Sequence, residues 1–180
     1  MSRYFLDNAY YFITVPTYQR GQIFNTPEKK RILLERVREG TIKFSLRETD
    51  YSILANHYHL IGYFQKGRII PKFLQYLNGG AAYDVHKRFG SPAVNTPTWD
   101  EYHVYCVTDD AVLAKIRGYV VGNPLKHGDV SSFAELSQYP FSSYAQLVTQ
   151  FGEPTVQEWV RSVIATEEND LINSITKQPD

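Results

Sequence analysis

The chain has 180 residues (20.8 kDa), of which 43% are hydrophobic and 21% are charged, the composition of one ordinary globular domain. Its 14 Tyr, 10 Phe and 2 Trp are far too many for an intrinsically disordered protein. The single cysteine, Cys106, excludes an internal disulfide and a zinc site built from several thiolates. No segment approaches the roughly 20 apolar residues of a membrane span, so we expect a cytoplasmic protein with no membrane partner.

The net charge of zero hides two halves of opposite sign. Residues 1–128 contain 17 Lys and Arg against 11 Asp and Glu, a net charge of +6, whereas residues 129–180 contain 2 against 8, a net charge of −6. A basic body followed by an acidic segment fits a nucleic-acid-binding protein whose tail tunes its affinity. A solvated acidic helix explains the same pattern equally well.

The first elements are a strand and a helix. Residues 9–18 are aromatic and β-branched, which predicts a strand. We expect this strand to end near Pro16. Thr26 is a candidate N-cap, Pro27 fits the first helical position, and apolar residues at helical spacing predict a helix that ends at Gly40.

The middle of the chain contains two strand segments and a second helix. Residues 42–48 and 51–64 have strand-like patterns, and Ala55 with Asn56 can turn the longer one back as a hairpin. Residues 69–90 form a helical segment with a bend expected at Gly79 and Gly80.

The last elements are a short strand and further helices. Residues 102–108 predict a strand, and residues 109–123 predict a helix that Pro124 ends. An irregular extension over 133–154 and one terminal helix over 155–175 follow. The order predicts an α+β fold, a ferredoxin-like antiparallel sheet with helices packed on it and a C-terminal helical extension.

Two histidines in one predicted strand are candidate metal ligands. His57 and His59 are two apart, and strand alternation puts them on the same face. Two imidazoles can chelate one transition-metal ion and leave coordination positions open for substrate oxygens. A pair of half-exposed strand histidines with no metal is the alternative.

Tyr119 and Asn123 lie four apart on the third predicted helix, with Lys115 one turn earlier on the same face. A tyrosine nucleophile needs a metal, a cation such as Lys115 or a base to stabilise its phenolate. Tyr119 could equally be a packing residue at the edge of the buried face, and Asn123 could cap the helix.

Four motifs in order resemble the REP-associated tyrosine transposase branch of the HUH single-tyrosine transposases. They are YSILANHYHLIGYF (51–64), TWDEYHVYCVTDD (98–110), GYVVGNPLKHG (118–128) and YPFSSY (139–144). The resemblance covers residues 10–144. It implies a catalytic domain over residues 1–128 and an acidic C-terminal extension with a terminal helix over residues 129–180.

The resemblance also implies the chemistry. His57 and His59 would be metal ligands, Tyr119 the nucleophile and Asn123 the third ligand, with Mg²⁺ or Mn²⁺ as cofactor. The implied activity is that of a transposase, a nickase and strand transferase that acts on hairpin-forming, REP-like single-stranded DNA through a 5′-phosphotyrosine intermediate. The family includes monomers and homodimers, and both states are open here.

Single-stranded DNA binding needs phosphate neutralisation and base stacking, and basic residues are interleaved with aromatic ones along this chain. The basic residues considered are Arg20, Lys29, Lys30, Arg31, Lys66, Arg68, Lys72, Lys87, Arg88, Lys115, Arg117 and Lys126. Lys66, Arg68 and Lys72 follow the histidine strand closely and, with Lys115, are the predicted DNA contacts.

Two other functions fit parts of the sequence. A descendant of the same family that binds DNA hairpins without cutting them fits the neutral net charge. A hydrolase that uses the two histidines with a water nucleophile fits the His-x-His motif alone, and its activity would survive Tyr119→Phe.

Overall fold

The computed structural model describes residues 5–90 and 96–176. Six elements form the first part of the chain in the order βαββαβ, and helices follow. These six are β1 (Ala9–Pro16), α1 (Pro27–Lys43), β2 (Arg47–Ile53), β3 (His57–Phe64), α2 (Ile70–Phe89) and β4 (His103–Val107), with short 3₁₀ turns η1 (Tyr18–Arg20) and η2 (Gly67–Ile69). The helices that follow are α3 (Asp110–Lys126), α4 (Phe133–Gln138), α5 (Tyr144–Phe151), α6 (Glu153–Val163) and α7 (Glu168–Thr176).

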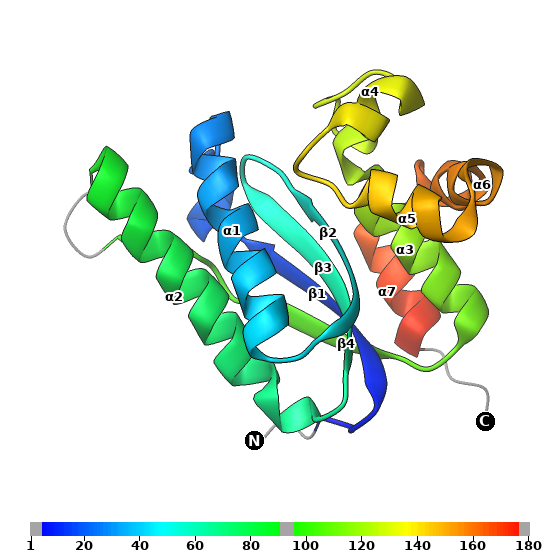
Figure 1. The fold of residues 1–180 in the computed structure, drawn as a ribbon, viewed down its shortest axis with the longest axis horizontal. Coiled ribbons are helices and arrows are strands. Elements are labelled where there is room, and N and C mark those ends of the chain that lie inside the picture. Colours follow the sequence, from blue (N-terminus) through cyan, green and yellow to red (C-terminus); the bar gives the residue numbers. More distant parts are fainter. Residues whose placement is uncertain (1–4, 91–95, 177–180) are drawn as a thin grey trace.

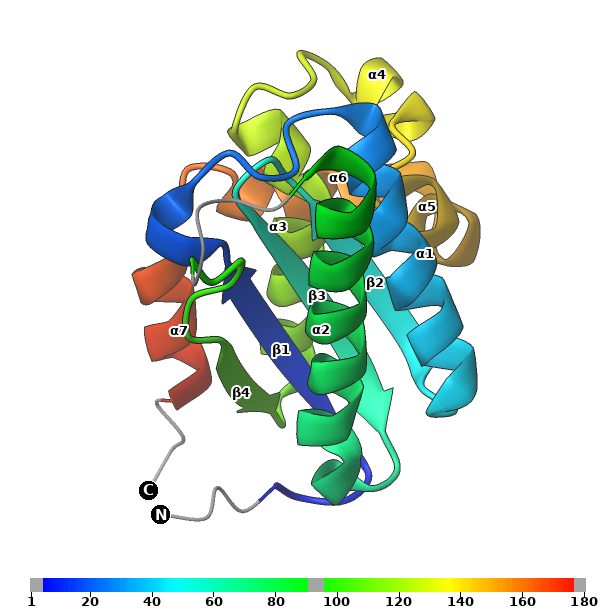
Figure 2. The same ribbon diagram turned by 90° about the vertical axis from the view of Figure 1, so that its left-hand side faces the viewer.

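The four strands form one antiparallel sheet in the order β2-β3-β1-β4. Helices α1 and α2 cover one face of the sheet, and α3 and α7 cover the other (Figures 1 and 2). The predicted α+β, ferredoxin-like fold with C-terminal helices is therefore confirmed. Among the described residues, no helix is both long and apolar enough to cross a membrane.

The alternation of β1 assigns its side chains to two cores. Tyr11, Ile13 and Val15 are buried in the core formed with α1 and α2. Phe12 packs in a separate core with residues of α3, α6 and α7, among them Tyr119. The sheet thus has two buried faces, which explains why its strands are nearly continuous runs of buried residues.

The predicted helix starts and strand positions are largely confirmed. The Thr26 side chain accepts a hydrogen bond from the Lys29 amide, and Asp109 caps α3 in the same way at Val112. Strands β2 and β3 pair as the predicted hairpin around Ala55 and Asn56. The strand predicted over 42–48 is wrong, because α1 continues to Lys43 and β2 begins only at Arg47.

The helix end predicted at Gly40 is also wrong, and the bend predicted at Gly79 and Gly80 does not interrupt its helix. Helix α1 continues through Gly40, and α2 is uninterrupted through Gly79 and Gly80. A Cβ on Gly40 would lie 2.5 Å from a Leu77 methyl, and one on Gly80 would lie 2.8 Å from the Arg36 side chain. Gly40 and Gly80 therefore permit close packing of α1 on α2, and this tertiary contact outweighs their low helix propensity.

Helix α3 does not end at Asn123, as predicted from Pro124, but continues to Lys126 with Pro124 inside it. Its residues from Ile116 to Pro124 are all buried, so tertiary packing compensates for the hydrogen bond that proline cannot donate. The buried Arg117 guanidinium anchors the helix to β2 through Glu48 (2.7 Å) and Asp50 (3.5 Å).

The C-terminal region is more helical than predicted. The segment expected to be irregular contains α4 and α5, and the single terminal helix is divided into α6 and α7. Gly152, with φ of +85°, separates α5 from α6 in a conformation that glycine adopts without strain. Helix α6 packs closely on α3, since a Cβ on Gly118 would lie 2.5 Å from the Trp159 carbonyl carbon and one on Gly122 would lie 2.6 Å from Val160.

The contact between α3 and α6 can be tested at Gly118. We expect Gly118→Ala to lower the free energy of unfolding by about 1–3 kcal/mol, because the added methyl group meets Trp159 backbone that cannot move freely. Gly79→Ala is the matched control, since no atom lies within 4 Å of a Cβ there, and it should stabilise the protein by about 0.5–1 kcal/mol. Urea unfolding measures both. Equal stabilisation by the two variants would contradict this packing.

Candidate active site

The two strand histidines meet on the sheet face that α3 covers. His57 and His59 are 6% and 0% exposed, and their ring centres lie 4.8 Å apart. Burial is the main cause that lowers the pKa of His57, to about 4, with the positive charge of a protonated His127 a further cause. Burial also holds the pKa of His59 well below its ordinary value. Both imidazoles are therefore neutral at pH 7 and able to bind a metal ion.

Asn123 of α3 reaches the same place. Its side chain is completely buried and its Nδ2 donates to the Tyr119 carbonyl oxygen at 3.3 Å, one helical turn back. This bond orients the amide so that Oδ1 faces His57 Nε2 at 3.4 Å. The i,i+4 spacing on α3 therefore brings Asn123 to the histidine pair as well as to Tyr119.

The hydrogen-bond partners of the histidines leave lone pairs that point into the site. His57 Nδ1 lies 2.7 Å from Asn56 Oδ1, which can only accept, so Nδ1 carries the hydrogen and Nε2 a lone pair. That lone pair faces the Asn123 oxygen, another acceptor. His59 Nε2 is buried and has no hydrogen-bond partner among the described residues.

These three atoms fit a divalent cation. His57 Nε2 and Asn123 Oδ1 are two acceptors that face each other, and His59 Nε2 is buried without a partner among the described residues. Both arrangements are unfavourable unless a positive charge lies close to these atoms. No three His, Cys, Asp or Glu side chains of residues 5–90 and 96–176 gather as a metal site. Together with the amide oxygen of Asn123, the two imidazole nitrogens form a mixed set of donors that a divalent cation can occupy.

Tyr119 packs against His59 in this cluster. Its ring centre lies 5.3 Å from that of His59 and 6.2 Å from that of Phe12, and the residue is 4% exposed. Burial, with the negative charge of Glu168 as the next cause, raises the pKa of Tyr119 to about 12. The phenol is therefore protonated at neutral pH. The Asn123 side chain and the charge of Arg20 act in the opposite direction and lower the pKa of the phenol. The Lys126 ammonium lies 5.1 Å from the ring centre, where the sequence analysis expected Lys115 as the nearby cation.

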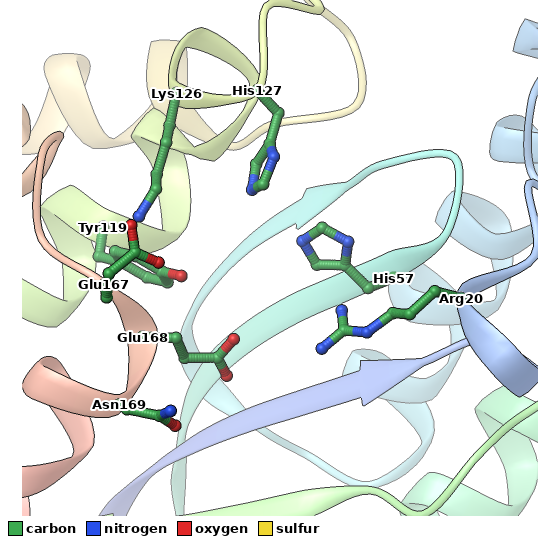
Figure 3. Close-up of a pocket in the computed structure, with 8 residues that line it drawn as sticks. All are labelled: Arg20, His57, Tyr119, Lys126, His127, Glu167, Glu168 and Asn169. Atoms are coloured by element: carbon green, nitrogen blue, oxygen red, sulfur yellow. The ribbon is translucent and has the colours of Figure 1, made fainter.

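A pocket of about 280 Å³ opens beside Tyr119 and His57 (Figure 3). Residues from η1, β3, α3 and the start of α7 line it, and they carry charges of both signs. They are Arg20, His57, Tyr119, Lys126, His127, Glu167, Glu168 and Asn169. The pocket thus places a hydroxyl, two imidazoles, two cationic side chains and two carboxylates around a space large enough for a phosphate group.

The structure brings together His57, His59, Tyr119 and Asn123, which spacing predicted as two separate pairs and the family resemblance joined into one site. It does not bring the predicted DNA-contact residues to the pocket. Lys66, Arg68 and Lys72 lie past the end of β3 that is opposite to His57, and the exposed Lys115 does not line the pocket.

His127, Thr14 and Glu168 are among the residues of the site that sequence reasoning missed. His127 follows Asn123 by four residues, and its ring centre lies 5.2 Å from that of His57. Helical spacing could have indicated it. Thr14 lies directly opposite His59 in the β1–β3 register, and Glu168 reaches Thr14 from α7. These two residues could not be found from local patterns, because Thr14 depends on the strand register and Glu168 is 154 residues away from Thr14 in the sequence.

Comparisons with known proteins bear on the fold. No protein-family model and no curated protein matches the chain. A solved REP-associated tyrosine transposase, bound to a REP hairpin, is similar with a TM-score of 0.68 at 17% identity, over 86% of this chain and 88% of that one. A candidate transposase from Deinococcus radiodurans has a TM-score of 0.49 at 21% identity, over 66% of this chain and 93% of that one. The chain therefore has the fold of the REP-associated tyrosine transposase that its motifs resemble.

Proposed function

We propose that this protein is a transposase-like enzyme that cuts and rejoins hairpin-forming single-stranded DNA through a 5′-phosphotyrosine intermediate on Tyr119. One observation carries the proposal. Tyr119 and His57 line one pocket, and the fully buried His59 and Asn123 lie against them, with the Asn123 oxygen 3.4 Å from His57 Nε2 and the His59 ring centre 5.3 Å from that of Tyr119. The fold shared with a transposase that binds a REP hairpin supports the choice of substrate.

His57 Nε2, His59 Nε2 and Asn123 Oδ1 hold Mg²⁺ or Mn²⁺ in this proposal. When bound, such an ion polarises a non-bridging phosphate oxygen and orients the scissile bond. The chain contributes the rest. Asn56 fixes the hydrogen of His57 on Nδ1, and the Tyr119 carbonyl fixes the orientation of the Asn123 amide. The ligand atoms are therefore oriented by their own hydrogen bonds.

The Tyr119 hydroxyl oxygen attacks the scissile phosphorus. A tyrosyl ester to the 5′ phosphate forms, and the bond from phosphorus to the 3′ oxygen breaks. The phenol loses one proton and the leaving 3′ oxygen gains one, so the products are the ester and a free 3′ hydroxyl. The ester conserves the energy of the broken bond, and attack by a 3′ hydroxyl reverses the step and rejoins the strand.

Arg20 and Lys126 neutralise the phosphate during this step. They lie on opposite sides of the pocket, with Arg20 beside His57 and Lys126 beside Tyr119 (Figure 3). The charge on Arg20 also favours ionisation of the buried phenol, whose pKa of about 12 is far above neutral. Lys66, Arg68, Lys72 and Lys115 remain proposed contacts to more distant parts of the DNA.

The nucleophile is tested by covalent capture. Wild type mixed with a labelled hairpin oligonucleotide and Mn²⁺ should give a protein-linked fragment on a denaturing gel, and Tyr119→Phe should give none. Tyr105→Phe is the matched control, because its ring also lies 6.2 Å from that of Phe12 but does not line the pocket, and its adduct should be unchanged. Hairpin binding without an adduct in wild type would instead indicate a binding-only protein. Cutting that survives Tyr119→Phe would indicate a water nucleophile.

The ligand set is tested by titration with Mn²⁺ in a calorimeter. We expect His57→Ala and Asn123→Ala each to weaken binding at least about tenfold, equal to about 1.4 kcal/mol, because each removes one of three ligands. His86→Ala is the control, since that residue is hydrogen-bonded to Thr98 on the other face of the sheet. Unchanged affinity in Asn123→Ala would remove the amide from the ligand set.

Basic residues in the pocket and basic residues away from it should affect different steps, which kinetic measurements can distinguish. Arg20→Ala and Lys126→Ala should slow adduct formation at saturating DNA by about 10- to 1,000-fold, because they lose charge at the reacting phosphate. Lys66→Ala and Lys72→Ala should weaken DNA binding and flatten its salt dependence while the rate at saturation stays constant. A loss of rate at saturation in the second pair, with none in the first, would contradict this assignment.

A further inference from the structure

A hydrogen-bonded chain extends from His59 away from the proposed metal position. Thr14 of β1 lies directly opposite His59 in the strand register, and its hydroxyl oxygen is 3.0 Å from His59 Nδ1. The same hydroxyl donates to Glu168 Oε1 at 2.6 Å. Thr14 is 1% exposed, and Glu168 is the first residue of α7. Three residues from β1, β3 and α7 therefore form one chain.

The hydrogens available to Thr14 and Glu168 determine which atom donates in each of these two hydrogen bonds. A threonine hydroxyl has one hydrogen and a carboxylate has none, so the Thr14 hydrogen lies on the Glu168 side. The Thr14 oxygen can then only accept from His59, and the hydrogen of the neutral imidazole must be on Nδ1. His59 Nε2 keeps its lone pair and points into the buried site without a partner among the described residues.

We propose that Glu168 is a positioning residue of the active site, which acts through Thr14 to hold His59 in the tautomer that can bind a metal. The proposal rests on the proposed function, because only a metal-binding role gives the tautomer a consequence. In the other tautomer, Nε2 carries the hydrogen and cannot act as a ligand. Without Glu168, the Thr14 hydroxyl is able to donate to Nδ1 and thereby favours that tautomer.

The two histidines are thus oriented in different ways. His57 depends on Asn56, its immediate neighbour in sequence. His59 depends on a carboxylate from the acidic C-terminal region, 154 residues from Thr14. Glu168 lines a pocket proposed to bind phosphate, where its negative charge repels the phosphate. The proposed role explains this placement, because the same carboxylate holds His59 in the tautomer that can bind a metal. It also makes α7 a part of the active site.

The tautomer can be measured without metal or DNA. Long-range ¹H–¹⁵N correlation spectra of metal-free protein labelled at histidine distinguish the two tautomers of His59, and a His59→Gln spectrum assigns its signals. Wild type should have the hydrogen on Nδ1. Glu168→Ala and Thr14→Val should transfer a substantial fraction to Nε2. The matched controls, Glu167→Ala and Thr14→Ser, should behave as wild type, since the first removes the neighbouring pocket charge and the second keeps the hydroxyl.

Calorimetric Mn²⁺ titrations of the same variants complete the test. Glu168→Ala and Thr14→Val should weaken Mn²⁺ binding about 10- to 100-fold, as loss of a partner behind a metal-binding histidine typically does. A His59 tautomer that stays on Nδ1 in Glu168→Ala would overturn the proposal, as would an equal loss of affinity in Glu167→Ala. If the tautomer shifts as expected but wild type binds no Mn²⁺, the hydrogen-bonded chain stands and the proposed metal-dependent function fails.

Discussion

The antiparallel pairing of β1 with β3 is the constraint on which the rest of this site depends. Its register sets Thr14 opposite His59 and Pro16 opposite His57, which turns both histidines toward α3. A slip of one residue would turn them into the core beneath α1 and α2. Because the sheet is buried on both faces, the pairing is fixed by two independent cores. The position of the proposed metal ligands is therefore set by a strand pairing that is buried on both faces.

Helix α3 must then be positioned so that Tyr119 and Asn123 lie beside the two histidines, and the C-terminal helices help to fix it in that position. Arg117 ties α3 to the edge strand β2, while Gly118 and Gly122 let α6 approach closely on its other side. Tyr119 and Asn123 lie between these contacts, so a small displacement of α6 would move Tyr119, the proposed nucleophile. Helix α7 adds Glu168 to the pocket. The acidic C-terminal region therefore packs against the site, and its Glu168 carboxylate accepts a hydrogen bond from Thr14 of β1.

Much of the site could be predicted from the sequence because its spacing is local. Alternation puts His57 and His59 on one face, and the helical repeat joins Tyr119 to Asn123. Misassignments arose where tertiary packing outweighs local propensity, as at Gly40 and Pro124, which lie inside helices. Thr14 and Glu168 could not be found from local patterns. Their contact depends on the β1–β3 register and on the division of the C-terminal segment into α6 and α7.

The most direct test of the central claim is a crystal structure of the Mn²⁺-loaded protein with a hairpin oligonucleotide, in which anomalous scattering locates the ion. The account predicts one strong anomalous peak bound by His57 Nε2, His59 Nε2 and Asn123 Oδ1, with the Tyr119 hydroxyl directed at a DNA phosphate. A manganese ion bound elsewhere, or DNA seated on a surface away from Tyr119, would contradict it.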